Sequence, residues 1–573
     1  MNTGTWFPDP SRCRYLCLLV VSGCIFTLAR STATAEIISQ ARRIVWTPGV
    51  PGGIPGRTTI CANVVTNFGA AGNGVHDDAP AIQNAINACS KDQVVFIPAG
   101  TYRLNSQLQI SKSIVLRGAG PSKTLLKTYA DWHGIQLGDF PSAPVATNVS
   151  GSPAKDATTI TVMSIASLSL SVGDFICIDQ INDGLEVINN PEAPDASRDG
   201  NTRSMRQITR ITEINGQTLT INPPLYHAYS ASQNPQVWKV SQGGSMTTFA
   251  GVEDLYIERM SPSGTQGYSN IKMVACAYCW VKNIESKFAE FRHVDLDRVF
   301  ECEVRDSFFN DGMHWDLGGF AYGVVSNASS ANLIENNVFY HLRHSMVVHA
   351  GGSGNVYGYN YSYATYQGED WLAPDMFIHG AHAHMNLFEG NFVDKLHADF
   401  THGSGSYNTF FRNNVIRASA AMTITRGRRT VELEKAQYYY NIVGNVLGQS
   451  GESWTALDDG GRRTSTGAYV YSLGYLDAGS RKSTDPQTKA TALFHGNYDY
   501  ATKTVRWDAT VADRTLPSSL YLAAKPSWFG NLPWPSVGPD LTPMSSAIPA
   551  RERSGGASNP PPTAPFNLRI TSP

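Results

Sequence analysis

Between Asn283 and Asn445 the apolar residues come in short runs, and an Asn or Asp repeatedly precedes each run. Seven such polar residues are spaced 23, 31, 23, 31, 23 and 31 residues apart, at Asn283, Asp306, Asn337, Asn360, Asn391, Asn414 and Asn445. A repeat of about 23 residues with three short strands is typical of one solenoid coil, and the longer alternate repeats predict loops on one side. Stacked Asn side chains hydrogen-bond from coil to coil, which satisfies polar groups at a sharp buried corner. The pattern predicts an all-β chain folded as a right-handed parallel β-helix, a single-stranded solenoid.

The segment before these coils has the pattern of a cap. A Gly-rich turn leads to Asp77 and Asp78, and apolar residues then recur at helical spacing. This pattern predicts an amphipathic helix from about Pro80 to Cys89, with the Asp pair at its start. A strand, a turn and a second strand are expected over 94–102, and a further strand and turn over 113–120. A helix at the open end of a solenoid covers strand edges that would otherwise pair with another molecule, so we interpret it as an N-terminal capping helix.

The coil repeat lapses between residues 141 and 240. β-Forming stretches at 157–163, 172–179 and 208–221, the last with an Asn215-Gly216 hairpin signal, predict a small antiparallel β insertion. Such insertions often line a cleft. The stretch from Leu516 to Asp540 is expected to close the far end. The predicted divisions are a leader (1–35), the cap and first coils (36–140), the β-rich insertion (141–240), the main β-helix with the cleft (241–540), and a Pro/Gly/Ser-rich linker and tail (541–573).

The amino-acid composition excludes several classes of protein. The chain has 573 residues, of which 42% are hydrophobic and 16% are charged, which excludes a disordered protein. Its 45 basic and 47 acidic residues give a net charge of -2, so no general basic field exists to hold nucleic acid. The 51 Gly and 25 Tyr residues are typical of β-rich extracellular proteins.

The first 35 residues predict export. Arg12 and Arg14 precede the apolar run from Tyr15 to Leu28, and small residues lead up to Ala35, which is typical of a signal peptide cleaved after that residue. An uncleaved anchor and a lipid anchor at Cys24 are the alternatives. No later stretch is long and apolar enough to cross a membrane. A secreted, periplasmic or extracellular location is therefore expected.

Six cysteines remain after the leader, an even number that permits disulfides in an exported protein. Cys61 and Cys89 are the first pair to consider. Cys276 and Cys279 have no second pair at zinc-ribbon spacing, so we expect buried thiols. Cys279 and Cys302 are 23 residues apart and are predicted to stack in adjacent coils.

The N-terminal block, from the Gly-rich turn at Asn67 to Gly120, resembles the opening of the pectate-lyase-like superfamily, which includes polygalacturonases, rhamnogalacturonase-type enzymes, exo-β-1,3-glucanases and phage tailspikes. The coil repeat extends the likeness to about Tyr500. The resemblance implies the fold and a polysaccharide partner, but it does not assign an activity. The polygalacturonase signature is not present in order, so its catalytic residues are not transferred to this chain.

Histidines gather in one part of the predicted β-helix. Eight of fourteen lie between His341 and His402, and His349, His379 and His402 follow similar apolar runs. Because coils stack about 4.8 Å apart, we expect these three imidazoles to form a column along one sheet. His344 and His397 each lie five residues earlier and suggest a second column, with Asp375 in the middle coil.

Charged and aromatic residues surround these columns in the sequence. Lys395 and Asp399 complete the predicted catalytic set, and the expected substrate-binding residues are Trp371, Glu369, Arg417 and Arg426. Histidine serves as a general acid or base near neutral pH. Two other interpretations stay open. The histidines could form an inert ladder like the Asn residues, or they could bind zinc or copper, although a straight line of ligands suits tetrahedral geometry poorly.

Two enzymatic mechanisms fit this set. In β-elimination from a uronate polymer, the Lys, Arg and His side chains would neutralise the carboxylate and move protons, and calcium at Asp375 or Asp399 could assist. In hydrolysis, two carboxylates would flank the bond, drawn from Asp295, Asp316, Glu369, Asp375 and Asp399. The abundance of His, Lys and Arg favours a lyase. A non-catalytic glycan-binding β-helix is the third possibility, with Tyr357, Tyr359, Tyr361, Tyr363 and Tyr366 as an aromatic platform. The oligomeric state is left open.

Overall fold

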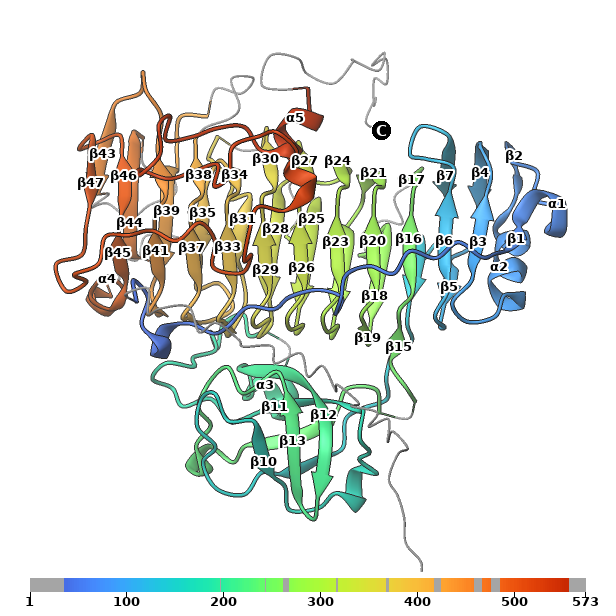
Figure 1. Cartoon of the computed structure of the whole chain (residues 1–573), viewed down its shortest axis with the longest axis horizontal. Coiled ribbons are helices and arrows are strands. Elements are labelled where there is room, and N and C mark those ends of the chain that lie inside the picture. The colour runs from blue at the N-terminus through green and yellow to red at the C-terminus, as the bar shows by residue number, and fades with distance from the viewer. Residues whose placement is uncertain are drawn as a thin grey trace, which may run out of the picture. The chain divides into compact units, whose positions relative to one another are not determined.

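A computed structural model describes residues 36–555, except 196, 243, 261–266, 316–317, 367–369, 417–423, 458–465 and 476–484. The predicted leader at 1–35 and most of the predicted tail therefore lie outside the described residues. Within the described chain, successive coils each add one strand to three long sheets, which confirms the predicted parallel β-helix. Figure 1 shows the strands side by side in a row.

The sheets are named by their size. The 12-stranded sheet contains, in spatial order, β1 (Ile60–Asn63), β3 (Val94–Ile97), β6 (Val115–Gly118), β16 (Gly251–Glu253), β20 (Trp280–Lys282), β23 (Glu303–Arg305), β26 (Leu333–Glu335), β29 (Val356–Gly358), β33 (Leu387–Glu389), β37 (Thr409–Phe411), β41 (Asn441–Val443) and β45 (Leu493–His495). The 13-stranded sheet contains β2 (Asn73–Asp77), β4 (Gly100–Leu104), β7 (Thr124–Thr128), β17 (Tyr256–Arg259), β21 (Glu285–Ala289), β24 (Phe308–Gly312), β27 (Val338–Tyr340), β30 (Tyr361–Tyr363), β34 (Phe392–Val393), β38 (Asn414–Val415), β42 (Val446–Leu447), β46 (Asn497–Asp499) and β47 (Thr504–Arg506).

The third sheet, which carries the candidate site, has 11 strands. They are β5 (Leu108–Ile110), β8 (Ile135–Leu137), β18 (Ile271–Val274), β22 (Arg292–Asp297), β25 (Tyr322–Asn327), β28 (His344–His349), β31 (Met376–Ile378), β35 (Leu396–Ala398), β39 (Arg428–Glu434), β44 (Ala468–Tyr475) and β43 (Trp454–Leu457). Short parallel bridges at one corner add β15 (Thr247–Thr248), β19 (Cys276–Ala277), β32 (Ala383–His384), β36 (Gly405–Ser406) and β40 (Gln437–Tyr438).

In the part of the chain that the structure describes, helices are few and short. They are α1 (Val64–Phe68), α2 (Ala79–Ala88), α3 (Arg198–Asn201), α4 (Pro486–Thr491) and α5 (Pro549–Arg553). The predicted capping helix is α2: its apolar residues Ile82, Ala85 and Ile86 are buried against the end of the coil core. The predicted disulfide between Cys61 and Cys89 is also present and joins the end of α2 to β1. None of the helices in the described chain is long and apolar enough to cross a membrane.

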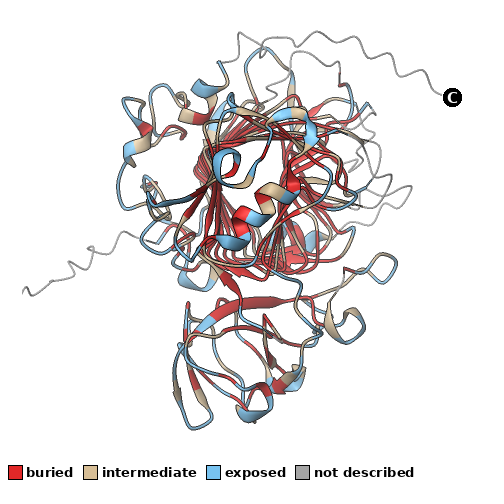
Figure 2. Cartoon of the chain, turned by 90° about the vertical axis from the view of Figure 1, so that its right-hand side faces the viewer, coloured by how far each residue is buried: buried red, intermediate tan, exposed pale blue. Residues whose placement is uncertain are grey.

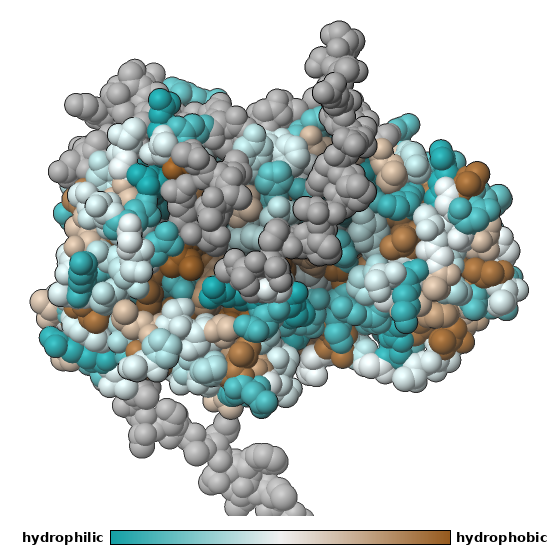
Figure 3. All heavy atoms as spheres, turned by 90° about the horizontal axis from the view of Figure 1, so that it is seen from above, coloured by the Kyte–Doolittle hydropathy of each residue, from teal (hydrophilic) through white to brown (hydrophobic). Residues whose placement is uncertain are grey.

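The hydrophobic core fills the inside of the coil. On β28 the side chains of Met346 and Val348 belong to this core, whereas Val347 between them belongs to a small separate cluster outside it. This alternation follows from the two-residue period of a strand. Figure 2 looks along the coils and shows the buried residues gathered on their walls. In the view from above, hydrophobic residues on the visible described surface form only small areas among hydrophilic ones (Figure 3).

An Asn ladder holds the corner of the coils, as predicted, but its register differs. The backbone N–H of each ladder residue donates to the side-chain oxygen of the ladder residue in the next coil, at 2.9–3.1 Å. The ladder residues are Asn337, Asn360, Asn391, Asn413, Asn445 and Asn497. The expected members Asn283, Asp306 and Asn414 are each one residue away from the ladder. Before Asn337 the ladder runs through the Ile284 N–H, which donates to Ser307, and the Ser307 N–H, which donates to Asn337. Cys279 and Cys302 do stack, with the Cys279 N–H donating to Cys302 Sγ at 3.4 Å.

The insertion forms its own antiparallel sheet with a separate apolar core. Its strands are, in spatial order, β10 (Thr159–Thr161), β13 (Thr218–Asn222), β12 (Arg206–Asn215), β11 (Phe175–Asp179), β14 (Gln236–Lys239) and β9 (Ala146–Asn148). β12 and β13 form the hairpin that Asn215-Gly216 predicts.

The stretch from Leu516 to Asp540 does not close the far end. It runs along the side of the coils, where Tyr521 Oη donates to Glu335 at 2.8 Å and Arg412 pairs with Asp540 at 2.8 Å (Figure 1). This segment also explains the Tyr stretch, because Trp534 donates to Tyr359 Oη at 2.9 Å and covers it. Tyr357, Tyr359 and Tyr361 are buried, so they offer no exposed aromatic platform.

Candidate active site

On the outer face of the 11-stranded sheet, residues that pair in register on neighbouring strands form columns that run from coil to coil. One column consists of Val325, Val347, Phe377, His397 and Glu432. Two residues further along each strand, Asn327 pairs with His349. The same level continues into His379 and Asp399, which directly follow β31 and β35.

The predicted histidine column is therefore correct for two of its three members. His349 and His379 follow in register, but Asp399 takes the third level and His402 comes later in the chain. The segment after Asp399 leaves the sheet because it pairs with the insertion: the Asn190 N–H donates to His402 O at 3.0 Å. The second predicted column is wrong. His344 lies level with Tyr322, whereas His397 lies level with Phe377.

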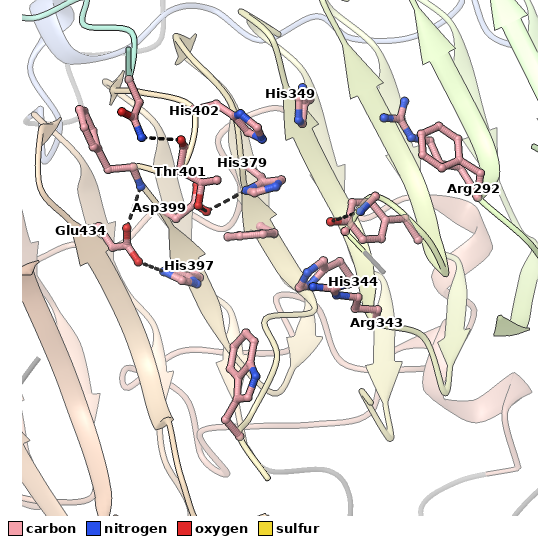
Figure 4. Close-up of a pocket in the computed structure, with 18 residues that line it drawn as sticks. Arg292, Arg343, His344, His349, His379, His397, Asp399, Thr401, His402 and Glu434 are labelled. Atoms are coloured by element: carbon pink, nitrogen blue, oxygen red, sulfur yellow. Dashed lines mark hydrogen bonds and ion pairs between the residues drawn. The ribbon is translucent and has the colours of Figure 1, made fainter. Parts of the chain in front are cut away.

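A pocket of about 620 Å³ opens over this face, a size suited to a small ligand or a few sugar units. Figure 4 shows its lining side chains. Among the described residues it is lined by Asn190, Phe291, Arg292, Gly318, Gly319, Tyr322, Arg343, His344, His349, Trp371, Phe377, His379, His397, Asp399, Phe400, Thr401, His402 and Glu434. Seven of the predicted site residues are in this set: His344, His349, Trp371, His379, His397, Asp399 and His402.

His349, His379 and His402 form a triangle rather than a line. Their ring centroids are 4.8–5.4 Å apart. The ring planes are inclined by 55–74°, so the rings are not stacked as an inert ladder would be. Each ring has a partner at Nδ1: Asp195 at 3.1 Å from His349, Asp399 at 2.8 Å from His379, and the Ala193 carbonyl at 2.7 Å from His402. Burial, followed by the neighbouring His379, lowers the pKa of His349 well below its usual value.

The insertion builds one side of this site. Asp195 also accepts the Ala350 N–H at 3.0 Å, and Asn190 Nδ2 donates to Thr401 O at 2.8 Å. Ile188 is joined to Ser404 by two hydrogen bonds of 2.8 Å. Burial raises the pKa of Asp195, although His402 and Arg206 counteract it. The expectation that the insertion lines the cleft is met at the histidine triangle.

His344 occupies the opposite part of the pocket. Its Nδ1 lies 2.6 Å from the Pro374 carbonyl, which can only accept a hydrogen bond, so Nδ1 carries the proton and Nε2 carries the lone pair. Burial and the adjacent Arg343 lower the pKa of His344 well below its usual value, so the ring is neutral. Its ring contacts that of Tyr322 at 4.7 Å. Arg292 completes this region and pairs with Asp295 at 2.5 Å.

Buried charges lie beneath His397. Its Nε2 is 3.3 Å from Glu434 and 3.8 Å from Glu432. Glu432 also pairs with Lys395 and lies 3.7 Å from Arg429. Burial lowers the pKa of His397 to about 3. Lys395 is thus part of a closed ion-pair cluster below the pocket floor and is fully buried.

Four further predicted site residues, and the hydrolase candidate Asp316, lie elsewhere or are not described. Asp375 is buried away from the pocket and accepts the backbone N–H groups of Asp394 and Lys395 at 2.7 and 2.9 Å. Arg426 is half-exposed and lies 3.9 Å from Asp370, outside the lining of the pocket. Glu369 and Arg417 fall outside the described residues, as does Asp316.

Calcium does not match the donors found here. The ion prefers six to eight oxygen ligands. Asp375 is enclosed by backbone N–H groups, and burial, together with Asp394, raises its pKa to about 8. Asp399 Oδ2 is engaged by His379 and by the Thr401 hydroxyl at 2.5 Å. We therefore assign no catalytic step to calcium.

Sequence reasoning misses four residues of the pocket lining, namely Arg292, Tyr322, Arg343 and Glu434, and also Asp195, which pairs with His349. Arg343 directly precedes His344, so a search for cations beside the histidines would have found it. Asp195 gives no such signal, because its position depends on how the insertion packs against β28.

Sequence comparisons with known proteins match only part of the chain. Residues 61–193 match the family described as "Rhamnogalacturonase A/epimerase, pectate lyase-like". Over 77 residues the chain is 38% identical to Mannuronan C5-epimerase AlgE5 of Azotobacter vinelandii, a match that spans 12% of this chain and 8% of the relative. Alginate lyase 7 of the same organism is 36% identical over 88 residues, spanning 14% of this chain and 10% of the relative.

Solved structures with a similar arrangement include the tailspike protein gp49 from Pseudomonas phage LKA1, with a TM-score of 0.48 and 15% identity over 72% of this chain and 77% of that chain. The A-module of the Azotobacter vinelandii mannuronan C-5 epimerase AlgE6 has a TM-score of 0.39 and 15% identity over 73% of this chain and 100% of that chain. The three parallel sheets confirm the β-helix fold, and the match over residues 61–193 supports the resemblance to the pectate-lyase-like superfamily in that part of the chain.

Proposed function

We propose that the protein is an exported carbohydrate-active enzyme that cleaves a uronate-containing polysaccharide by β-elimination. The partial matches to a mannuronan epimerase and an alginate lyase support a polysaccharide of this class, because both names refer to uronate polymers. Elimination and C5 epimerisation share their first step, removal of the proton at C5 beside the carboxylate. The site must therefore hold a carboxylate and present a base.

The state of His344 is the observation on which the proposal rests. The Pro374 carbonyl fixes the proton on Nδ1, and the ring is neutral, so Nε2 is a base at neutral pH. His344 lines the pocket, as Figure 4 shows. In the proposed reaction Nε2 accepts the C5 proton of a bound uronate.

Two guanidinium groups in the same pocket suit the substrate carboxylate. Arg292 pairs with Asp295 through Nη1, and its buried Nε has no hydrogen-bond partner among the described residues. Arg343 lies next to His344 in the chain and lines the same space. Charge-assisted hydrogen bonds from arginine to a carboxylate stabilise the extra negative charge that develops as the C5 proton leaves.

Tyr322 is the proposed proton donor to the leaving oxygen. Its ring contacts His344, and burial raises the pKa of its phenol, so the hydroxyl keeps its proton at neutral pH. As elimination breaks the C4–O bond, this proton moves to the departing sugar oxygen and a C4–C5 double bond forms. Trp371 and Phe377 provide apolar surfaces on which sugar rings can rest.

Export is part of the proposal. It rests on the leader pattern of residues 1–35 and on the Cys61–Cys89 disulfide, because disulfides persist mainly in oxidising compartments. Fractionation of cells that express the full chain would place it inside or outside the cytoplasm.

The activity test uses the chain from Glu36 onward and a panel of acidic and neutral polysaccharides. Ultraviolet absorbance reports an unsaturated product, and a reducing-end assay reports any cleavage. We expect both signals on a uronate polymer and neither on neutral glucans. Reducing ends without absorbance would overturn the proposal in favour of a hydrolase.

Deuterium uptake at C5 without cleavage would instead indicate an epimerase. If no signal appears, binding to the same panel would indicate a glycan-binding protein. Each result replaces β-elimination with a specific alternative.

A further inference from the structure

The three histidines of the triangle have a shared protonation pattern. Each Nδ1 atom has one hydrogen-bond acceptor at 2.7–3.1 Å. The acceptor is the Asp195 carboxylate for His349, the Asp399 carboxylate for His379 and the Ala193 carbonyl for His402. A hydrogen-bond acceptor opposite Nδ1 places the proton there and leaves the lone pair on Nε2. All three Nε2 atoms are therefore available as ligands.

These rings also bring their nitrogens together. One ligand nitrogen from each of His349, His379 and His402 lies within 4.8 Å of the other two. Figure 4 shows the three rings adjacent to one another on the pocket wall. In a tetrahedral zinc site with Zn–N bonds of about 2.0–2.1 Å, ligand nitrogens are about 3.3 Å apart. Small side-chain rotations would bring the three rings to that spacing.

The second nitrogen of each ring is open to a ligand from the pocket. Among the described residues, none donates a hydrogen bond to the second nitrogen of any of these three rings. The inclined ring planes, at 55–74°, also fit ligands around a point better than a stack.

We propose that His349, His379 and His402 bind one zinc ion through Nε2 and leave its fourth position open to the pocket. Three histidines with one open position are a common ligand set of catalytic zinc. Asp195, Asp399 and the Ala193 carbonyl are then the outer partners that orient the ligands, as metal-bound histidines usually require. The insertion supplies two of these three partners, so its packing assembles the site.

A second group of possible ligands, His397, Glu432 and Glu434, does not share these features. Lys395 and Arg429 already balance the charge of Glu432, and lower its pKa although burial raises it. A cation there would face two buried positive side chains. We therefore expect one zinc ion per chain rather than two.

This inference is independent of the proposed function, because metal binding is measured without turnover. The untagged chain from Glu36 onward is stripped with a chelator, equilibrated with zinc sulfate, dialysed and analysed for metal by mass spectrometry. We expect one zinc per chain and no retained calcium when calcium chloride replaces zinc. Zinc should also raise Tm, since it binds only the folded site.

Variants locate the ion. His379→Ala and His402→Ala should each weaken zinc binding at least 100-fold, whereas His344→Gln, in the same pocket, and His76→Ala, on the exposed cap, should keep one zinc per chain. Binding of zinc that is unchanged in the His379→Ala variant would overturn the proposal, as would the absence of binding to the folded wild-type chain.

A second measurement needs no variant. Cobalt(II) in place of zinc should give the visible absorption of tetrahedral coordination. A spectrum typical of an octahedral aqua ion would contradict three histidine ligands, whatever the stability of the variants. Two ions per chain would contradict the choice between the two ligand groups.

Discussion

Asp195 of the insertion lies 3.1 Å from His349 at the end of β28, so two separately folded parts of the chain meet at one imidazole. The carboxylate holds the proton of that ring on Nδ1. Because outer partners of this kind tune metal affinity, we predict that Asp195→Asn weakens zinc binding about 10- to 100-fold. A competition titration with a chromophoric chelator measures the affinity.

The matched control for this change is Asp174→Asn, which removes the insertion's ion pair with Lys239, at 2.9 Å. It should leave zinc affinity unchanged. Equal affinities for wild type and Asp195→Asn would show that Asp195 does not orient the metal ligand.

Loss of the proposed base, His344, should change the rate of cleavage and leave zinc binding unchanged. His344→Gln should lower kcat on the cleaved polymer about 10²- to 10⁴-fold, the usual contribution of a general base, while zinc per chain stays at one. The two readouts separate loss of the base from loss of the metal site. A variant that retains wild-type kcat would exclude His344 as the base.

Arg292 is predicted to act on substrate binding. Arg292→Lys keeps the charge but loses the planar pair of donors, so KM for a uronate polymer should rise about 10-fold or more. The control Arg298→Lys changes an arginine that pairs with Asp297 and does not line the pocket. Esterification of the substrate carboxylates should remove the difference between the Arg292 variant and wild type; a persistent difference would mean that Arg292 supports the fold instead.

The fold could be predicted from the sequence because its determinants are periodic or local. The Asn spacing sets the coil length, and Asn215-Gly216 marks a hairpin whatever surrounds it. The site depends on single-residue register, which composition does not reveal. His402 lies off the sheet, where Asn190 and Ala193 of the insertion hydrogen-bond to it, and this packing turns an expected line of histidines into a triangle.

The same limit appears in the Asn ladder, where the sequence favours Asn414 and the structure uses Asn413. Asn413 accepts from the Asn391 backbone and side chain and donates to Phe388 O at 2.9 Å, all in a buried corner. Among the described residues, the Asn414 side chain hydrogen-bonds only to Ser545.

Asn413→Ala should therefore lower the free energy of unfolding by about 3 kcal/mol, because it leaves buried donors and acceptors without partners. Asn414→Ala should cost about 1 kcal/mol or less. Denaturant unfolding of the two variants under matched conditions measures the difference. Equal losses would mean that the ladder runs through the residue that the sequence favours.

Glu389 is predicted to make stability depend on pH. Its carboxylate is fully buried and accepts from the Leu520 N–H at 2.8 Å and from Tyr359 Oη at 2.9 Å. Burial raises the pKa of Glu389 from 4.5 to about 7 in the folded chain.

Between these two values the folded state keeps a proton that the unfolded state has lost, so this contribution is complete below pH 4.5 and disappears as the pH rises through 7. A shift of this size corresponds to about 3 kcal/mol. Glu389→Gln cannot titrate, and its amide oxygen can still accept the hydrogen bond from the Leu520 N–H. It should therefore lose less stability than wild type between pH 5 and pH 7.5. The exposed Glu213→Gln should follow the wild-type slope. Thermal melts at pH 5 and pH 7.5 measure the change in stability of each variant. If Glu389→Gln and wild type lose the same stability between these pH values, the buried carboxylate is ionised throughout this range.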